Sequence, residues 1–192
     1  MKTEPLFHVD FRAEPKARLE FVPVAGRTTG VGAYSTMGAG HPDWADTERF
    51  SQEPGGLRLK QGGLLGGWFS ARGTTEIVLT PGSGALEISV GRSVHLEHCV
   101  TLDLESGRVE LRTLARDYRR SRAKGETYDL KERVTQRAQA TVPCRRRRRM
   151  RLVIENNRTS ISVAINGTIV LKKPVATQCG GILGIYADDA IL

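Results

Sequence analysis

The sequence lacks three features that would assign it to several common classes of protein. Apolar residues at helical spacing are nearly absent from its 192 residues, and no apolar stretch reaches the 18 or so residues that span a bilayer. Its three cysteines, Cys99, Cys144 and Cys179, show no CxxC spacing. We therefore expect no helical fold, no membrane insertion, no disulfide framework and no cofactor.

The N-terminal stretch "MKTEPLFHVDF" also lacks the apolar segment of a secretory signal. A cytoplasmic location is the expectation, unless the sequence is a fragment or a mature form; the sequence does not fix the compartment.

Period-two alternation of apolar and polar residues is abundant, and this pattern is typical of half-buried strands. It occurs in residues 7–11, 75–80, 85–91, 93–104, 109–113 and 137–142. In the C-terminal third it continues through residues 150–155, 159–165 and 168–173, followed by residues 180–187. Asn166-Gly167 separates two of these segments and predicts a tight type I′ hairpin turn. The predicted fold class is all-β.

Two regions interrupt the alternation inside what we expect to be a single domain, residues 1–192. Residues 26–67 hold eleven glycines, which predicts a loop region with little strand beyond "LRLK". A basic excursion at about residues 115–149 holds either a short helix or a long connection between strands. Residues 112–151 contain fifteen Lys or Arg and four acidic residues, a net charge of +11, so the rest of the chain carries −3 of the total of +8.

The motifs "TLDLESGRVELR" and "ISVAINGTIVL" resemble those of the concanavalin A-like, or laminin-G-like, jelly-roll superfamily. Within it, the pattern is most similar to 3-keto-disaccharide hydrolase domains and to the C-terminal sandwich of invertase- and levanase-type glycosidases. The resemblance implies a β-sandwich of two antiparallel sheets, with "FHVDF" as its first strand. These families add one more strand after "DDAIL"; here that strand is either missing or reduced to residues 190–192.

Jelly-roll glycosidases of the laminarinase type carry alternating carboxylates on one strand, as nucleophile and acid/base. The nearest equivalents here are Asp103 and Glu105, although Thr101 stands where the first glutamate is expected. They are weak catalytic candidates, and the alternative is that they are exposed acids at a strand end. His95 and His98 point to opposite faces of a strand, so they do not predict a metal site.

A sugar presents apolar C–H faces and hydroxyl groups, which an aromatic ring flanked by carboxylates suits. Trp44 between Asp43 and Asp46 is therefore a candidate ligand-binding group, and His95 and Glu97 on one strand face are two more. The alternative for Trp44 is a place in the core.

The run of five arginines is a candidate polyanion-binding site: Arg145, Arg146, Arg147, Arg148 and Arg149. Burying such charges without partners is prohibitive, so we expect the run to lie outside the sheet, as a loop or strand lip.

We predict a non-catalytic carbohydrate-binding or accessory module of a glycoside-active protein, whose partner is an oligo- or polysaccharide. The alternatives are a jelly-roll glycoside hydrolase and an electrostatic binder of anionic glycan or nucleic acid.

Overall fold

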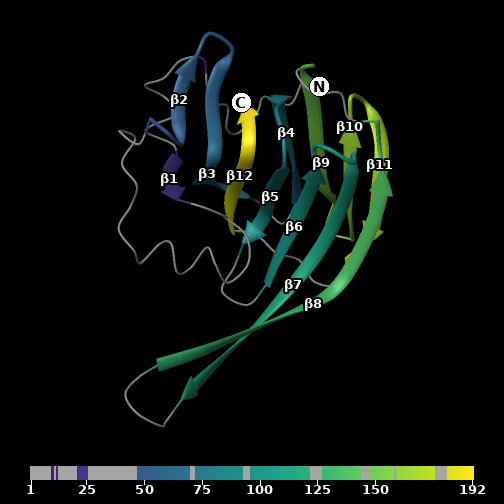
Figure 1. Cartoon of the computed structure of the whole chain (residues 1–192). Coiled ribbons are helices and arrows are strands. Elements are labelled where there is room, and N and C mark those ends of the chain that lie inside the picture. Colours follow the sequence, from purple (N-terminus) through teal and green to yellow (C-terminus); the bar gives the residue numbers. More distant parts are fainter. Residues whose placement is uncertain are drawn as a thin grey trace.

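A computed structural model gives the fold of this chain. It describes residues 10, 12, 21–25, 47–69, 72–92, 96–121, 127–143, 148–157, 159–175 and 181–192. Within these ranges the regular elements are twelve β-strands, and no helix occurs (Figure 1). They are β1 Phe21–Ala25, β2 Phe50–Glu53, β3 Gly56–Phe69, β4 Arg72–Pro81, β5 Ala85–Arg92, β6 Leu96–Asp103, β7 Arg108–Ser121, β8 Thr127–Thr141, β9 Met150–Asn157, β10 Ser160–Ile165, β11 Thr168–Pro174 and β12 Gly181–Ile191.

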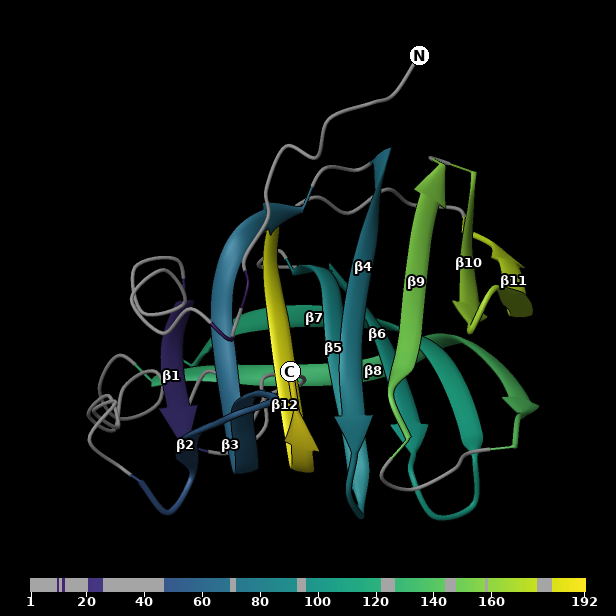
Figure 2. The ribbon, with the colours of Figure 1, turned by 90° about the horizontal axis from the view of Figure 1, so that it is seen from above.

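The strands form two antiparallel sheets that face each other (Figures 1 and 2). One sheet runs β3-β12-β5-β6-β7-β8, with β1 and β2 pairing successive parts of the free edge of β3. The other runs β4-β9-β10-β11, and a short pairing of β4 with the end of β12 joins the two. This architecture confirms the predicted jelly-roll β-sandwich.

Alternating apolar side chains from both sheets make the core. On β5 they are Leu86, Ile88 and Val90, and on β9 they include Leu152 and Ile154, all at most 1% exposed. At about 25 cal/mol per Å² of apolar surface removed from water, this burial is the main stabilising contribution. The alternation read from the sequence for these strands is therefore correct.

The turn between β10 and β11 also follows the sequence. Asn166 and Gly167 have φ angles of 51° and 84°, the positive values that a type I′ turn requires. Ile165 pairs with Thr168 directly across it.

The prediction of a loop over residues 26–67 is wrong for its last part, which forms β2 and most of β3. At least one glycine of β3 serves close packing rather than a loop. A Cβ on Gly62 would lie 3.0 Å from the Phe50 ring carbons Cε1 and Cζ, so any larger residue there would push the ring of β2 away from the backbone of β3. The number of glycines in a segment does not distinguish a loop from a strand that packs closely against its neighbour.

The C-terminal residues are also not the stump of a separate strand. Ala190 and Ile191 continue β12, which runs between β3 and β5 and ends with Leu192 bonded through both backbone groups to Leu57. The "FHVDF" segment, by contrast, falls almost entirely outside the described residues.

The basic excursion is a β-hairpin, so the short-helix alternative is wrong for its described residues. β7 and β8 stay paired from Arg108↔Thr141 to Ser121↔Thr127, whereas β6 pairs with β7 only as far as Ala115. Beyond that point each of the two strands has only the other as a pairing partner among the described residues, and in Figure 1 they project from the sandwich. We call residues 116–121 and 127–132 the arm.

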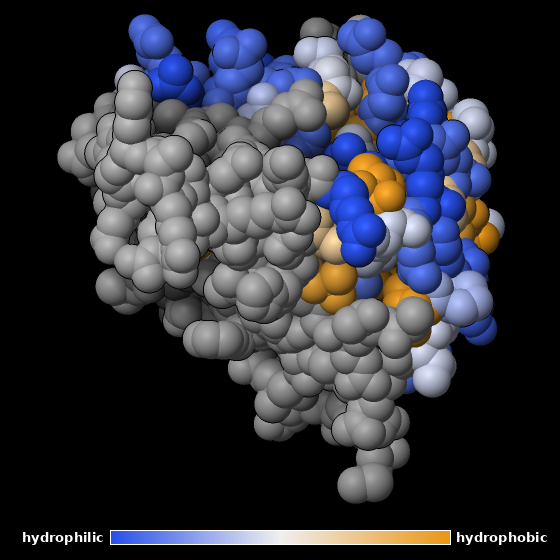
Figure 3. Space-filling model, turned by 90° about the horizontal axis from the view of Figure 1, so that it is seen from below, coloured by the Kyte–Doolittle hydropathy of each residue, from blue (hydrophilic) through white to orange (hydrophobic). Residues whose placement is uncertain are grey.

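The edge strands of the two sheets, β8 and β11, approach each other. The Lys173 Nζ donates a hydrogen bond of 2.6 Å to the Arg137 carbonyl oxygen of β8. The large exposed apolar side chains of the described residues are Val134 and Ile169, one on each edge strand. Seen from below, the described surface is mainly hydrophilic with small apolar areas (Figure 3).

Candidate functional site

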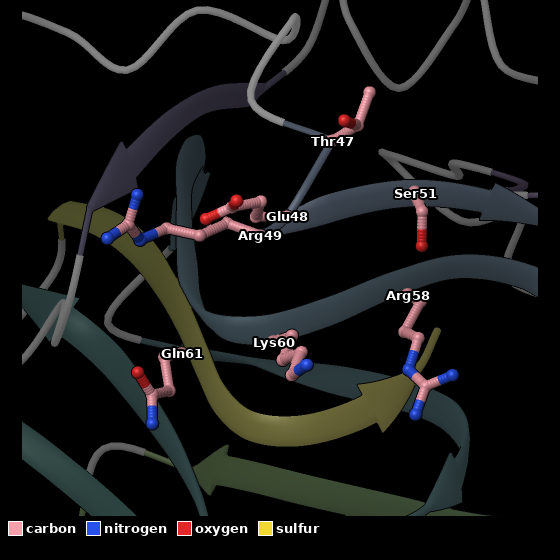
Figure 4. Close-up of a pocket in the computed structure, with 7 residues that line it drawn as sticks. All are labelled: Thr47, Glu48, Arg49, Ser51, Arg58, Lys60 and Gln61. Carbon is pink, nitrogen blue, oxygen red and sulfur yellow. The ribbon is translucent and has the colours of Figure 1, made fainter.

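A pocket of about 650 Å³ opens beside β2 and β3 (Figure 4). Its described lining is wholly polar: Thr47, Glu48, Arg49, Ser51, Arg58, Lys60 and Gln61. The volume is within the range of roughly 300–1,000 Å³ that is common for small-molecule sites. Thr47, Glu48 and Arg49 come from the turn before β2, and the other four come from the paired strands.

Alternation along β3 explains this polarity. Leu57 and Leu59 point into the core, so Arg58 and Lys60 point away from it. Gln61 then has a φ of 49°, an uncommon value for a residue other than glycine. The backbone bends there, and the Gln61 side chain stays exposed on the pocket wall.

Arg58 is held in place by two carboxylates. Its Nε lies 2.9 Å from Asp189 Oδ1 on β12, and its Nη1 lies 3.0 Å from Glu53 Oε1 on β2. These hydrogen bonds, first the one to Asp189 and then the one to Glu53, raise the pKa of Arg58. The guanidinium is a fixed part of the wall.

A second polar group lies on the face of β5, β6, β7 and β12 that points away from the core. We call it the polar face: Glu87, Ser89, Cys99, Thr101, Glu110, Arg112 and Tyr186. The register aligns Tyr186, Glu87, Thr101 and Glu110 in one row across the strands, and Ser89, Cys99 and Arg112 in the next.

The middle of the polar face is buried although it is not apolar. Glu87 is 1% exposed, and Ser89 and Cys99 are 0% exposed. Arg112 Nη2 donates a 3.1 Å hydrogen bond to Thr101 Oγ1 and lies 3.8 Å from Cys99 Sγ. Burial, and then the Glu87 carboxylate, raise the pKa of the Cys99 thiol, which favours the neutral thiol and low nucleophilicity.

Asp103 and Glu105 lie at the turn between β6 and β7. Asp103 Oδ1 accepts backbone hydrogen bonds from Glu105 at 2.8 Å and from Ser106 at 3.1 Å, and these bonds, with Ser106 first, lower the pKa of Asp103. Glu105 is exposed in the turn itself. The Asp103 carboxylate is thus occupied in turn formation.

The other predicted site residues have varied positions. Glu97 is fully buried in β6, and its proposed ligand contact stays a prediction. Asp43, Trp44, Asp46, His95 and Arg145, Arg146 and Arg147 lie outside the described residues. Arg148 and Arg149 are exposed and precede β9, so this part of the arginine run lies outside the strands as expected.

His98 is a core residue, with Nδ1 3.0 Å from Thr113 Oγ1. Among the described residues, no group of three His, Cys, Asp or Glu side chains is arranged to hold a metal ion. None of the described elements is a helix that could cross a membrane.

Sequence reasoning missed the pocket because its residues fall in the predicted loop region. The useful signal was "LRLK", whose alternation puts Arg58 and Lys60 on one face. Nothing in the sequence predicted that Glu87 and Ser89 are buried, because alternation shows only that their side chains point away from the core.

The geometry defines a jelly-roll β-sandwich with a polar pocket beside β2 and β3, and solved structures of low sequence identity share that fold. The carbohydrate-binding module CBM66 from Bacillus subtilis has a TM-score of 0.54 at 12% identity, over 74% of this chain and 86% of that one. The Crh5 transglycosylase in complex with NAG has a TM-score of 0.55 at 12% identity, over 95% and 67%. SCLam, a non-specific endo-beta-1,3(4)-glucanase from family GH16, has a TM-score of 0.51 at 10% identity, over 76% and 64%.

These similarities support the jelly-roll β-sandwich fold. No family model and no curated protein matches the sequence.

Proposed function

We propose that this chain is a non-catalytic carbohydrate-binding module that takes an oligosaccharide in the pocket beside β2 and β3. The observation that carries the proposal is the lining of that pocket. Hydroxyl, amide, carboxylate and guanidinium groups, from Ser51, Gln61, Glu48 and Arg49 among others, surround a volume of about 650 Å³. A sugar hydroxyl both donates and accepts hydrogen bonds, and this set of side chains offers donors and acceptors.

Two further points support a saccharide ligand. Asp43, Trp44 and Asp46, which the sequence predicts as sugar-binding groups, directly precede Thr47 in the chain. The fold is also shared with a carbohydrate-binding module and with enzymes whose names describe action on glycans. The finer proposal is a sugar-associated laminin-G-like module that accompanies a glycoside-active protein.

The test is titration calorimetry of the full chain against a panel of neutral oligosaccharides. Ser51→Ala combined with Gln61→Gly should weaken binding about tenfold, because each removes a hydrogen-bonding group from the wall. Glycine at position 61 keeps the positive φ. Trp44→Ala should also weaken binding, whereas Lys172→Gln, an exposed change on β11, should not.

Equal binding by the wild type and the pocket variants would exclude this pocket as the sugar site. If no oligosaccharide of the panel binds, the proposed function is wrong.

A glycoside hydrolase is the second candidate, favoured by the row of side chains on the polar face. Glu87 and Glu110 flank Thr101 from the two neighbouring strands, which puts their backbones about 10 Å apart. Inverting glycosidases need two carboxyl groups roughly 6.5–9.5 Å apart. Glu110 Oε1, however, already lies 2.8 Å from Arg137 Nε.

Glu87→Gln distinguishes the two candidates. A hydrolase should lose several orders of magnitude of glycan cleavage with its fold intact, while a binding module has no cleavage to lose. Asp103→Ala with Glu105→Ala should leave any cleavage unchanged, because Asp103 is occupied in the turn.

A further inference from the structure

We propose that the pocket beside β2 and β3 prefers an anionic saccharide, one that carries a carboxylate or a sulfate, and that Lys60 binds the anionic group. This inference rests on the proposed function and narrows its ligand class. It starts from the formal charges of the described lining residues, which are three cationic and one acidic.

The cations of the pocket differ in how far their charge is already compensated. Arg58 is bonded to both oxygens of Asp189, at 2.9 and 3.3 Å, and to Glu53 at 3.0 Å. A guanidinium between two carboxylates has little attraction left for a ligand. Arg49 already makes an interaction of its own, and Glu48, its neighbour in sequence, also lines the pocket (Figure 4).

Lys60 is in a different position. Its backbone is fixed, because its amide donates a 2.9 Å hydrogen bond to the Arg49 carbonyl oxygen. Its cross-strand neighbour is Asp189, but both oxygens of that carboxylate are used by Arg58. Within the described part of the chain, the Lys60 ammonium has no hydrogen bond or ion pair, and its side chain is exposed.

The position of the second acid strengthens this argument. Glu53 pairs with Gly56 at the hairpin end of β2, whereas Lys60 lies level with Arg49 at the other end. Of the two carboxylates bound to Arg58, Glu53 therefore lies farther from Lys60 along the strands than Asp189 does. An ammonium on a pocket wall attracts anionic groups, and a hydrogen bond between two charged groups is roughly twice as strong as a neutral one.

The neighbouring groups suit the rest of a sugar ring. Ser51 and Gln61 supply uncharged hydrogen-bonding groups beside the cations, because Ser51 pairs with Arg58 across β2 and β3 and Gln61 follows Lys60 on β3. An acidic sugar has the matching arrangement, one anionic group on a ring of hydroxyls. This pocket is a different site from the arginine run at residues 145–149. Arg148 and Arg149, the described residues of that run, do not line the pocket.

The experiment compares each acidic oligosaccharide with an uncharged counterpart of the same chain. The probes are oligomers of galacturonate, glucuronate and mannuronate, each paired with its methyl ester, and a sulfated oligosaccharide paired with the unsulfated one. Binding to the full chain is measured by calorimetry at low and at high salt.

We expect at least one acidic member to bind about tenfold more tightly than its counterpart, and added salt should reduce that preference. Lys60→Gln should weaken binding of the acidic member more than binding of the uncharged one and so remove the preference, whereas the exposed Lys172→Gln should leave the preference intact. A preference for a uronate over its ester assigns a carboxylate ligand; a preference for the sulfated member assigns a sulfate.

Three results would overturn the inference. The first is binding of uncharged saccharides with no acidic preference, which leaves the proposed function standing. The second is an acidic preference that Lys60→Gln does not change. The third is binding of neither kind, which overturns the proposed function as well.

Discussion

The strand β7 passes through two regions that are stabilised in opposite ways. Up to Ala115 it lies inside the sheet, where Leu111 faces the core and Arg112 belongs to the largely buried polar face. From residue 116 onward it lies in the arm, where β8 is its sole partner strand in the described structure. Within one continuous strand, backbone pairing is therefore present both where buried side chains stabilise the segment and where the segment lies outside the sandwich.

The arm has a register that compensates for its missing neighbours. It places Arg116 opposite Glu132, Asp117 opposite Lys131, and Arg119 opposite Asp129. Opposite charges on facing residues stabilise a pair of strands by about 0.2–1 kcal/mol each, and an isolated two-stranded ribbon is only marginally stable. Opposite charges at paired positions of the arm therefore favour pairing of its two strands. On the polar face, by contrast, the charged groups are largely buried and need hydrogen-bonding or ionic partners.

The largest expected difference between the regions concerns leucines. Leu111→Ala should lower the free energy of unfolding by about 2–5 kcal/mol, because Leu111 is 1% exposed in the core. Leu130→Ala in the arm should cost less, because β8 and β7 have only each other as described partner strands there and an isolated two-stranded ribbon is only marginally stable. Chemical denaturation measures both, and equal losses would show that the arm is packed as tightly as the sandwich.

A smaller effect is expected at the other end of β7, where Asp103 accepts two backbone hydrogen bonds. Asp103→Asn should cost about 1 kcal/mol at pH 7. The pKa of Asp103 is lowered in the folded state from the ordinary 3.8, so its stabilisation is present above that value and is lost as the pH falls through the lower folded value. The difference in stability between wild type and variant should thus be largest at pH 7 and should shrink as the pH falls below 3.8, which denaturation curves over this pH range measure.

Reversing one charge of the arm should have a still smaller effect. Lys131→Glu places like charges opposite each other at Asp117 and should weaken the arm by a few tenths of a kcal/mol, up to about 1 kcal/mol. Adding Asp117→Lys should restore it. Amide hydrogen exchange measures the change within the arm, since such a segment opens locally. No recovery in the double variant would mean that these charges do not interact.

The smallest effect on stability is expected from the arginine run. Changing Arg145, Arg146, Arg147, Arg148 and Arg149 to serine should shift the free energy of unfolding by no more than about 0.5 kcal/mol, since exposed substitutions usually lie in that range. Retention on heparin should nevertheless be lost, because the bound charges that release counterions are gone. An unfolded variant would instead make the run structural.

The comparison also explains how far the sequence predicted this molecule. Strands with clean alternation, such as β9 and β10, were predictable because one face is apolar and the other is not. The strand β3 was not predictable, because Gly62 packs against the Phe50 ring, a contact that depends on a partner strand.

The candidate site was less predictable than the fold. Arg58 and Lys60 could be assigned to one face, but the different states of their charges depend on Asp189, 131 residues away from Arg58 in sequence. Long-range pairing of this kind leaves no local pattern.

The bond from Lys173 to the Arg137 carbonyl has a consequence for the behaviour of the protein at high concentration. The outer edge of a sheet carries backbone groups that can pair with another chain, and exposed edges with apolar residues are sites of aggregation. Here Lys173 of the edge strand β11 is hydrogen-bonded to the edge strand β8. Lys172, Lys173 and Pro174 are the last three residues of β11. A strand that approached from a second molecule would have to displace an ammonium group and meet a proline that offers no N–H, so the two edges protect each other from fibril-like growth.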